Sequence, residues 1–324
     1  MTSSASQTSR LVLGTAQLGM PYGIANRRGQ PDRRTAEAIV ARVWECGVRE
    51  FDTAQAYGES EIVLGNALKS LGLTRQAKVI SKFDAGIDHQ HSAGLRRALE
   101  QTIARLNISR LYAIMIHGEE LLDIWDKGLG GTLHKFITEG LVERIGISVY
   151  TPRNAIRALK TTGVTLLQIP GNLLDRRFEK EGVFEEAHRR GKQIYLRSVF
   201  LQGLLLMNIR ELTGAMDFAI PVIHRLINFS RKTGYSVKQL ALGYVKSAYP
   251  SPKVIFGCET TQQVQENFEL WKRELPGEIV DRIQEEFQNI PETILNPSLW
   301  ARSSSTKKGK DEQAQGQSPT YLRR

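Results

Sequence analysis

The chain reads Val48-Arg-Glu-Phe-Asp52 early in its sequence, and two later stretches share the same design, Lys78-Val-Ile-Ser-Lys82 and Tyr112-Ala-Ile-Met-Ile-His117. Each is a short, largely apolar run that ends in a polar residue able to move or steer a proton. Tyr57 follows the first run on the next loop. If these runs are parallel strands of one barrel, their carboxyl ends meet at one mouth, where the active sites of such barrels lie. The sequence therefore predicts a pocket that holds a carboxylate, a phenol, an ammonium and an imidazole.

Strand-like and helix-like segments alternate along most of the chain. The expected strands cover residues 11–15, 48–52, 78–82, 111–117, 143–149, 166–169, 193–199 and 253–257. The expected helices cover residues 35–46, 59–70, 93–106, 121–140 with a break at 128–131, 151–160, 181–190, 218–232, 236–248, 261–271 and 278–288. Strands that alternate with helices imply a parallel sheet covered by helices. The number of pairs, within about 290 residues, predicts an α/β fold, a closed (β/α)8 TIM barrel with a short N-terminal hairpin arm and extra C-terminal helices.

An open, doubly wound sheet is the alternative arrangement for this alternation. That fold usually carries a Gly-x-Gly-x-x-Gly turn after its first strand, where it binds the pyrophosphate of a dinucleotide. No such turn occurs in the sequence. The pattern therefore favours the barrel.

The composition suggests one domain with two disordered ends. Residues 1–9 are polar and rich in Ser and Thr, and lack the apolar run of a secretory signal. Residues 301–324 hold six Lys or Arg and two Asp or Glu, so this basic tail carries +4 of the net charge of +10. The tail is rich in Ser, Gln and Gly and has almost nothing to bury, which predicts disorder. The barrel itself is expected to span residues 10–300.

The remaining composition narrows the class of protein. No stretch approaches the roughly 20 apolar residues that span a membrane. Cys46 and Cys258 are the only cysteines, which do not form a disulfide framework and favour a reducing, cytoplasmic setting. The positive body fits an anionic small-molecule ligand. We expect a small-molecule enzyme that is monomeric or weakly homo-oligomeric, with no nucleic-acid or membrane partner and no metal site.

Several stretches resemble the aldo-keto reductases. The most recognisable are Phe51-Asp-Thr-Ala-Gln-Ala-Tyr-Gly-Glu-Ser-Glu61 and Leu64-Gly-Asn-Ala-Leu68. Later matches follow in order: Lys82 in Ile-Ser-Lys-Phe, His117 in Ile-Met-Ile-His-Gly, Gly146-Ile-Ser148, Gln168, Gln202-Gly-Leu204, Val254-Ile-Phe-Gly257 and Glu266-Asn267. The resemblance runs from about residue 11 to about residue 287 and implies that the catalytic residues are Asp52, Tyr57, Lys82 and His117.

The chemistry of these four side chains is consistent with carbonyl reduction. A hydride added to a carbonyl leaves an alkoxide that needs a proton, and a phenol with a reference pKa of about 10 is a poor acid near neutral pH. A nearby ammonium such as Lys82 would favour the phenolate and make Tyr57 a stronger acid. Asp52 would hold Lys82 in place, and His117 would donate a hydrogen bond to the substrate oxygen.

The resemblance also implies a nicotinamide cofactor, NADP(H) or NAD(H), lying extended across the barrel mouth. The nicotinamide amide would meet Ser148, Gln168 and Asn172, while the phosphates would meet Leu204 and the helix that follows Gly257. The full set of implied cofactor-binding residues is Gly14, Thr15, Ala16, Ser148, Gln168, Asn172, Arg197, Ser198, Gln202, Gly203, Leu204, Gly257, Cys258, Glu259, Thr260, Gln263, Glu266 and Asn267.

Three positions depart from the family pattern. Arg197 stands where members often stack an aromatic ring on the nicotinamide; it could stack flat instead, or grip an acidic substrate. Val149 stands where many members have an Asn that contacts the amide. The positions around Gly257 and Gln263 are neutral where NADPH-selective members are basic, and Glu259 lies between them. A carboxylate repels a 2′-phosphate but accepts hydrogen bonds from ribose hydroxyls, which predicts weak phosphate selectivity with a tilt to NADH.

These features predict an NAD(P)-dependent oxidoreductase that interconverts a carbonyl and an alcohol, with Tyr57 as the general acid and base. The substrate is an aldehyde or ketone, with sugar-derived and acidic compounds among the candidates, and Pro21-Tyr22 and Trp125 are expected to shape its pocket. Two other functions on the same fold are a regulatory subunit that senses the cofactor and a redox-neutral, nucleotide-dependent sugar enzyme.

Overall fold

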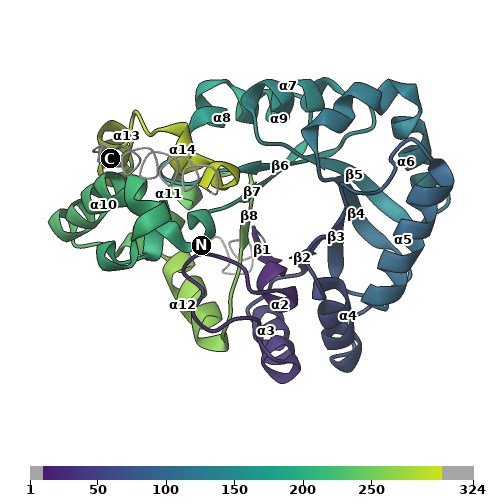
Figure 1. The fold of residues 1–324 in the computed structure, drawn as a ribbon, viewed down its shortest axis with the longest axis horizontal. Coiled ribbons are helices and arrows are strands. Elements are labelled where there is room, and N and C mark those ends of the chain that lie inside the picture. The colour runs from purple at the N-terminus through teal and green to yellow at the C-terminus, as the bar shows by residue number, and fades with distance from the viewer. Residues whose placement is uncertain (1–9, 301–324) are drawn as a thin grey trace, which may run out of the picture.

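The computed structural model describes residues 10–300, which form a closed barrel of parallel strands. The strands are β1 (Leu11–Gly14), β2 (Glu50–Asp52), β3 (Lys78–Phe83), β4 (Leu111–Ile116), β5 (Val142–Ser148), β6 (Leu166–Pro170), β7 (Gln193–Arg197) and β8 (Lys253–Phe256). They pair in chain order, and β1 also pairs with β8 to close the ring. Figure 1 looks into the barrel, with helices around its rim. The predicted barrel is confirmed.

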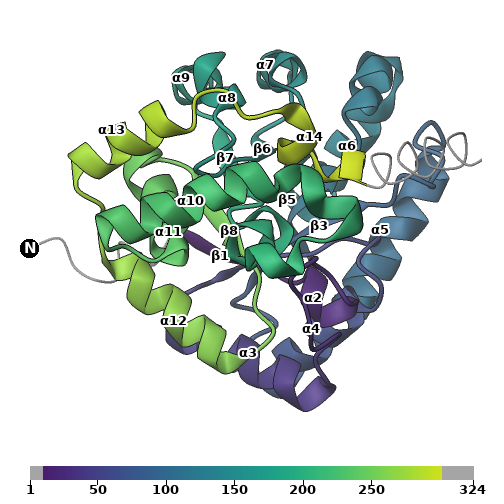
Figure 2. The same cartoon turned by 60° about the vertical axis from the view of Figure 1, so that its left-hand side comes forward.

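The helices occupy the connections between strands and extend beyond β8. They are α2 (Ala16–Gly19), α3 (Arg33–Glu45), α4 (Ser60–Ser70), α5 (Ser92–Leu106), α6 (Leu129–Thr138), α7 (Pro152–Lys160), α8 (Arg177–Lys180), α9 (Val183–Arg189), α10 (Ile220–Thr233), α11 (Val237–Ala248), α12 (Thr261–Lys272), α13 (Gly277–Glu286) and α14 (Glu292–Leu295). The 3₁₀ segments are η1 (Glu119–Lys127), η2 (Leu201–Leu206), η3 (Ile209–Glu211), η4 (Gly214–Ala219) and η5 (Pro297–Leu299). Figure 2 shows α10 and α11 side by side, with α12 and α13 flanking them.

The break expected at 128–131 is present in the structure, and the helix expected over 181–190 is shorter than predicted. The segment 121–140 forms η1 and α6, which meet at Gly128 with φ of 120°. The segment 181–190 contributes only α9, and Gly182, with φ of 66°, separates it from α8. A positive φ is open to glycine at little cost and interrupts a right-handed helix. Strand β7 likewise ends two residues earlier than expected, because Ser198 has φ of 63°.

The alternation of side chains along each strand positions the site. Barrel-interior residues include Ile80 of β3, Met115 of β4 and Leu166 of β6. Successive side chains of a strand point to opposite faces, so the residue two positions further on also points inward. Lys82 follows Ile80, His117 follows Met115 and Gln168 follows Leu166 in this way, which brings three polar groups to the carboxyl end of the barrel.

The outer faces of the strands pack against the helices. This layer holds most of the buried apolar residues. Examples are Phe51 of β2, which stacks with Trp44 of α3, and Leu99 of α5. Within residues 10–300, no helix is both long and apolar enough to span a bilayer. The expected hairpin arm lies outside the described residues, as do residues 1–9 and the basic tail 301–324, for which disorder is predicted.

Candidate active site

Asp52 and Lys82 form a buried ion pair at the ends of β2 and β3. The Nζ atom of Lys82 donates to both carboxylate oxygens of Asp52 at 2.8 Å and to the carbonyl oxygen of Thr53 at 2.9 Å. The Lys82 side chain is fully buried, and that of Asp52 is 5% exposed. The ammonium therefore has three acceptors, which is what allows a charged pair to be buried in an apolar barrel.

Tyr57 stands over this pair on a tightly held loop. Its hydroxyl lies 3.5 Å from the Nζ atom of Lys82, and the same Nζ lies 4.9 Å from the centre of its ring. The backbone is fixed by hydrogen bonds from the Tyr57 N–H to Ala54 and from the Ser60 N–H to Tyr57. A Cβ at Gly58, which has φ of 56°, would lie 2.5 Å from the carbonyl oxygen of Gly19. The phenol therefore depends on close backbone contact between this loop and α2.

His117 completes the predicted group. Its ring centre lies 5.9 Å from that of Tyr57, with the two planes at 78°. Burial, followed by the positive charges of Lys82 and Arg197, lowers the pKa of His117 from 6.5 to about 4. The imidazole is therefore neutral at pH 7 and offers one N–H donor. All four residues predicted as catalytic meet at the carboxyl end of the barrel.

The pKa of Tyr57 moves in the direction opposite to the prediction. Burial, followed by the negative charge of Asp52, raises it above the ordinary value of 10. Burial also lowers the pKa of Lys82, and its contact with Asp52 opposes that shift. The ammonium is 2.8 Å from both Asp52 oxygens but 3.5 Å from the phenol, so Asp52 largely offsets its charge. The phenol remains protonated until a strong base reaches it.

Gln168 and Ser148 are neighbours in the register of β5 and β6, close to the ion pair. The Nε2 atom of Gln168 donates to Oδ1 of Asp52 at 2.8 Å. The hydroxyl of Ser148 is buried and has no hydrogen-bond partner. A buried hydroxyl without a partner is unfavourable and rare. These two side chains therefore fit an amide-bearing ligand that would bond to Ser148.

A cavity of about 400 Å³ runs from this group toward α12. It is lined by Asp52, Tyr57 and most of the residues predicted to bind the cofactor: Gly14, Thr15, Ala16, Gln168, Arg197, Ser198, Gln202, Gly203, Gly257, Glu259, Gln263 and Asn267. Thr260 caps α12 beside it by accepting from the Gln263 N–H at 3.1 Å. The oxygen Oδ1 of Asn267 is buried without a partner. The cavity thus offers one further unsatisfied polar atom, near the start of α12.

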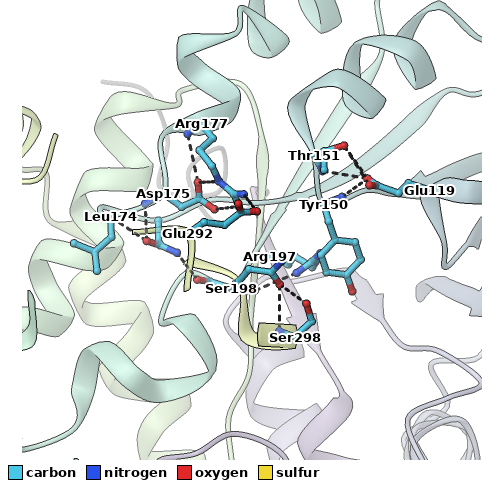
Figure 3. A network of polar contacts seen from close by, with 12 residues as sticks. Glu119, Tyr150, Thr151, Leu174, Asp175, Arg177, Arg197, Ser198, Glu292 and Ser298 are labelled. Carbon is cyan, nitrogen blue, oxygen red and sulfur yellow. Dashed lines mark hydrogen bonds and ion pairs between the residues drawn. The ribbon is translucent and has the colours of Figure 1, made fainter. Parts of the chain in front are cut away.

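Four further residues predicted to bind the cofactor do not line the cavity. Leu204 and Cys258 are buried, and Glu266 pairs with Lys238 at the α11–α12 surface. Asn172 accepts from the N–H groups of Leu174 and Asp175 and donates to the carbonyl oxygen of Ser198 at 3.1 Å. Figure 3 shows two of its partners, Leu174 and Ser198, near the Arg177–Asp175 pair. In the structure Asn172 holds the loop after β6 against the end of β7.

The loop after β1 lines the cavity in a way that the sequence did not indicate. The Ile24 N–H donates to the carbonyl oxygen of Gln202 at 2.9 Å, and a Cβ at Gly203 would lie 2.6 Å from the Cβ of Ala25. The cavity residues absent from the prediction are Gln17, Gly23, Ala25, Asn26, Val199, Phe200, Leu206, Met207, Glu211, Lys238, Ile255 and Phe256. Gly23 and Gly203, which lie at this contact, both have positive φ, and they are the local feature of the sequence that accompanies it.

Two aromatic residues expected near the substrate have different positions. Tyr22 lines the cavity, and burial together with Tyr57 raises its pKa to about 12. Trp125 does not line it; its ring is buried against Gly130 of α6, and its Nε1 donates to the carbonyl oxygen of Thr162 at 3.2 Å. Trp125 is therefore a packing residue, because its indole lies against α6 and the chain just after α7 rather than in the cavity.

Comparisons with known proteins agree with this architecture. The model of the aldo/keto reductase family matches residues 10–286. A D-threo-aldose 1-dehydrogenase from a Pseudomonas species is 23% identical over 321 residues, covering 85% of this chain and 95% of that protein. An NADH-specific methylglyoxal reductase from Escherichia coli K12 is 24% identical over 295 residues, covering 80% and 88%.

The fold agrees as well. An aldo-keto reductase from Bacillus halodurans, solved in its holo form, has a TM-score of 0.72 at 21% identity, covering 89% of this chain and 95% of that one. The family match spans every strand of the barrel and the ends of β2, β3 and β4, where the four polar groups meet. On this evidence the chain belongs to the aldo/keto reductase family of oxidoreductases.

Proposed function

We propose that this protein interconverts a carbonyl and an alcohol with a nicotinamide cofactor, and that Tyr57 transfers the proton. The observation that carries the proposal is the contact of Lys82 with both oxygens of Asp52 and with the Tyr57 hydroxyl. Bound in the cavity, the cofactor would supply or accept the hydride. In reduction Tyr57 gives its proton to the carbonyl oxygen, and in oxidation it takes the proton back.

The phenol of Tyr57, which lies over the Asp52–Lys82 ion pair, holds its proton firmly. With its pKa raised, Tyr57 stays protonated until negative charge develops on the substrate oxygen, which is a far stronger base than water. The phenolate that results lies beside the Lys82 ammonium, which stabilises it. Asp52 keeps the ammonium in position in the meantime. The hydrogen bond from Gln168 to Asp52 fixes the carboxylate from the other side.

His117 acts as a neutral donor in this proposal. Because its pKa is about 4, the imidazole does not place a second full charge next to Lys82. Its N–H orients the substrate oxygen and stabilises the developing alkoxide. It lies close enough to Tyr57 for both to reach one oxygen atom, since their ring centres are 5.9 Å apart.

The cavity fits a nicotinamide dinucleotide. The unpartnered hydroxyl of Ser148 and the amide of Gln168 would hold the carboxamide, and the unpartnered oxygen of Asn267 would accept from the adenine amino group. The free N–H groups at the start of α12 would favour phosphate. Glu259 lines the cavity near that helix, which supports a preference for NADH because a carboxylate repels a 2′-phosphate. The Escherichia coli relative, named as NADH-specific, is consistent with that preference.

Turnover with simple substrates tests the proposal. The protein is mixed with NADH or NADPH and a panel of aldehydes and ketones, and loss of the reduced cofactor's absorbance is followed. We expect turnover with at least one aldehyde. Tight nucleotide binding with no turnover across the panel would instead support a cofactor-sensing subunit or a redox-neutral enzyme.

A further inference from the structure

Arg197 places a positive charge in the cavity without an anion to balance it. Its Nη2 atom is buried and has no hydrogen-bond partner, and the hydrogen bond that its Nη1 donates to the Ser198 hydroxyl is long at 3.4 Å. Within residues 10–300, no carboxylate forms an ion pair with it, whereas the fully buried Lys82 of the same site pairs with Asp52. A buried charged donor without an acceptor is unfavourable, so the missing acceptor points to a ligand.

The guanidinium is held in place by its surroundings. It lies over the ring of Tyr150, with its carbon atom 4.2 Å from the ring centre. Figure 3 shows the two side chains together at the ends of β5 and β7. Glu119 accepts from the Tyr150 N–H at 2.7 Å and from the Thr151 N–H at 3.1 Å, which fixes the backbone of the stacked residue. The cation is therefore pre-positioned.

The backbone at Arg197 is fixed as well. Its carbonyl oxygen accepts from the Gly171 N–H at 3.0 Å, and the next carbonyl, of Ser198, accepts from Asn172. Ser198 itself has φ of 63°, which a residue other than glycine adopts only at a cost. Strained backbone persists where the surrounding structure imposes it, often at ligand sites. This positive φ ends β7 directly after Arg197.

The position of Arg197 indicates that the missing anion belongs to the substrate rather than to the cofactor. It lines the same cavity as Tyr57 and Tyr22, and its charge contributes to lowering the pKa of His117. The cofactor phosphates are expected at the start of α12, and an oxidised nicotinamide is itself a cation that Arg197 would repel. A guanidinium matches the two oxygens of a carboxylate in a bidentate pair.

We propose that Arg197 binds a carboxylate on the substrate, so that the preferred substrates are aldehydes or ketones that also carry a carboxylate group. This inference rests on the proposed function, because it names the substrate class of the same site. The Tyr150 ring stacks against the guanidinium. Tyr57 and His117 donate hydrogen bonds to the carbonyl oxygen of the same substrate molecule.

The test compares acids with their own neutral esters. Succinic semialdehyde and para-carboxybenzaldehyde are each paired with their methyl ester, so that only the charge changes within a pair. We expect kcat/KM to favour the acid by about tenfold or more in at least one pair, which is the effect of one good charge-assisted hydrogen bond. Arg197→Met should bring this ratio to about one, and Arg197→Lys should retain part of it. The exposed Arg153→Met is the matched control, in which the ratio persists.

Each other outcome overturns the inference. A ratio of one or less in the unmodified protein for both pairs means that no cation selects the acid. If Arg197→Met lowers turnover of acid and ester equally, with weaker cofactor binding in a fluorescence titration, Arg197 serves the cofactor. Esters that turn over better than acids would refute this inference alone, whereas no turnover of any aldehyde would refute the proposed function with it.

Discussion

A Cβ atom at Gly19 would lie 2.1 Å from the carbonyl oxygen of Tyr57. The two backbones therefore touch, and the loop that carries the phenol rests directly on α2. The Glu59 N–H donates to the carbonyl oxygen of Gly19 at 3.1 Å and locks this arrangement. The position of Tyr57 is thus set from the β1 loop as well as from β2.

Gly19→Ala should displace the Tyr57 loop. The added methyl group cannot fit without backbone movement, so we expect a loss of about 1–3 kcal/mol in the free energy of unfolding and a lower kcat. Thermal melting and steady-state kinetics measure the two effects. Gly131→Ala is the matched control: it lies in α6 with nothing within 4 Å of the new Cβ, and it should leave kcat unchanged and stabilise slightly. Equal behaviour of the two variants would refute the packing argument.

Lys82→Met should harm both stability and activity, because it leaves the Asp52 carboxylate buried without its partner. Removing one member of a buried ion pair typically costs about 3–5 kcal/mol. The double variant Asp52→Asn/Lys82→Met removes both charges and should recover much of the stability but none of the activity. Denaturant unfolding and turnover distinguish these effects. Recovery of turnover in the double variant would exclude a role for the ammonium in proton transfer.

The pKa of His117 predicts a pH dependence of stability. Its pKa is about 4 in the folded protein against 6.5 as a reference, so the unfolded chain takes up the proton first as the pH falls. The contribution of His117 should be absent above the unfolded-state value and should lower the free energy of unfolding between pH 6.5 and about 4. His117→Gln should flatten the curve in that window, while His134→Gln, at an exposed position of α6, should leave it as it was. An unchanged curve for His117→Gln would contradict the lowered pKa.

Glu259 should govern the choice between the two cofactors. We expect the unmodified protein to use NADH at least as well as NADPH. Glu259→Gln removes the repulsion of a 2′-phosphate and should raise the ratio of kcat/KM for NADPH over NADH by roughly tenfold, equivalent to about 1.4 kcal/mol. Glu278→Gln, exposed on α13, serves as the control. A hundredfold preference for NADPH in the unmodified protein would end this account of selectivity.

The sequence predicted the strand ends well because the signal there is local. Side chains two positions apart along a strand point to the same face. Lys82 follows the interior residue Ile80 and His117 follows the interior residue Met115 at this spacing, so both were expected to point into the barrel. The contact of Ile24 with Gln202 joins segments that are far apart in the chain, and no local pattern encodes it. The break at Gly128 was predicted from its local glycine run, whereas the shortening of the helix expected over 181–190 depended on a positive φ at Gly182 that a glycine permits but does not require.

The error in the pKa of Tyr57 has a different cause. The sequence placed an ammonium and a carboxylate near the phenol but did not give their distances. The direction of the shift depends on burial and on how Lys82 divides its charge between Asp52 and Tyr57, and those quantities exist only in three dimensions. Residue types can therefore predict which groups meet, while their protonation requires coordinates.

Proton transfer by Tyr57 is tested most directly with Tyr57→Phe, which keeps the ring and removes the hydroxyl. The account predicts that carbonyl turnover falls by about a hundredfold to ten-thousandfold, while the dissociation constant for NADH, read by fluorescence, stays within roughly threefold of the unmodified protein. Tyr235→Phe, outside the cavity, should keep full activity. Turnover by Tyr57→Phe within tenfold of the unmodified protein would contradict the account.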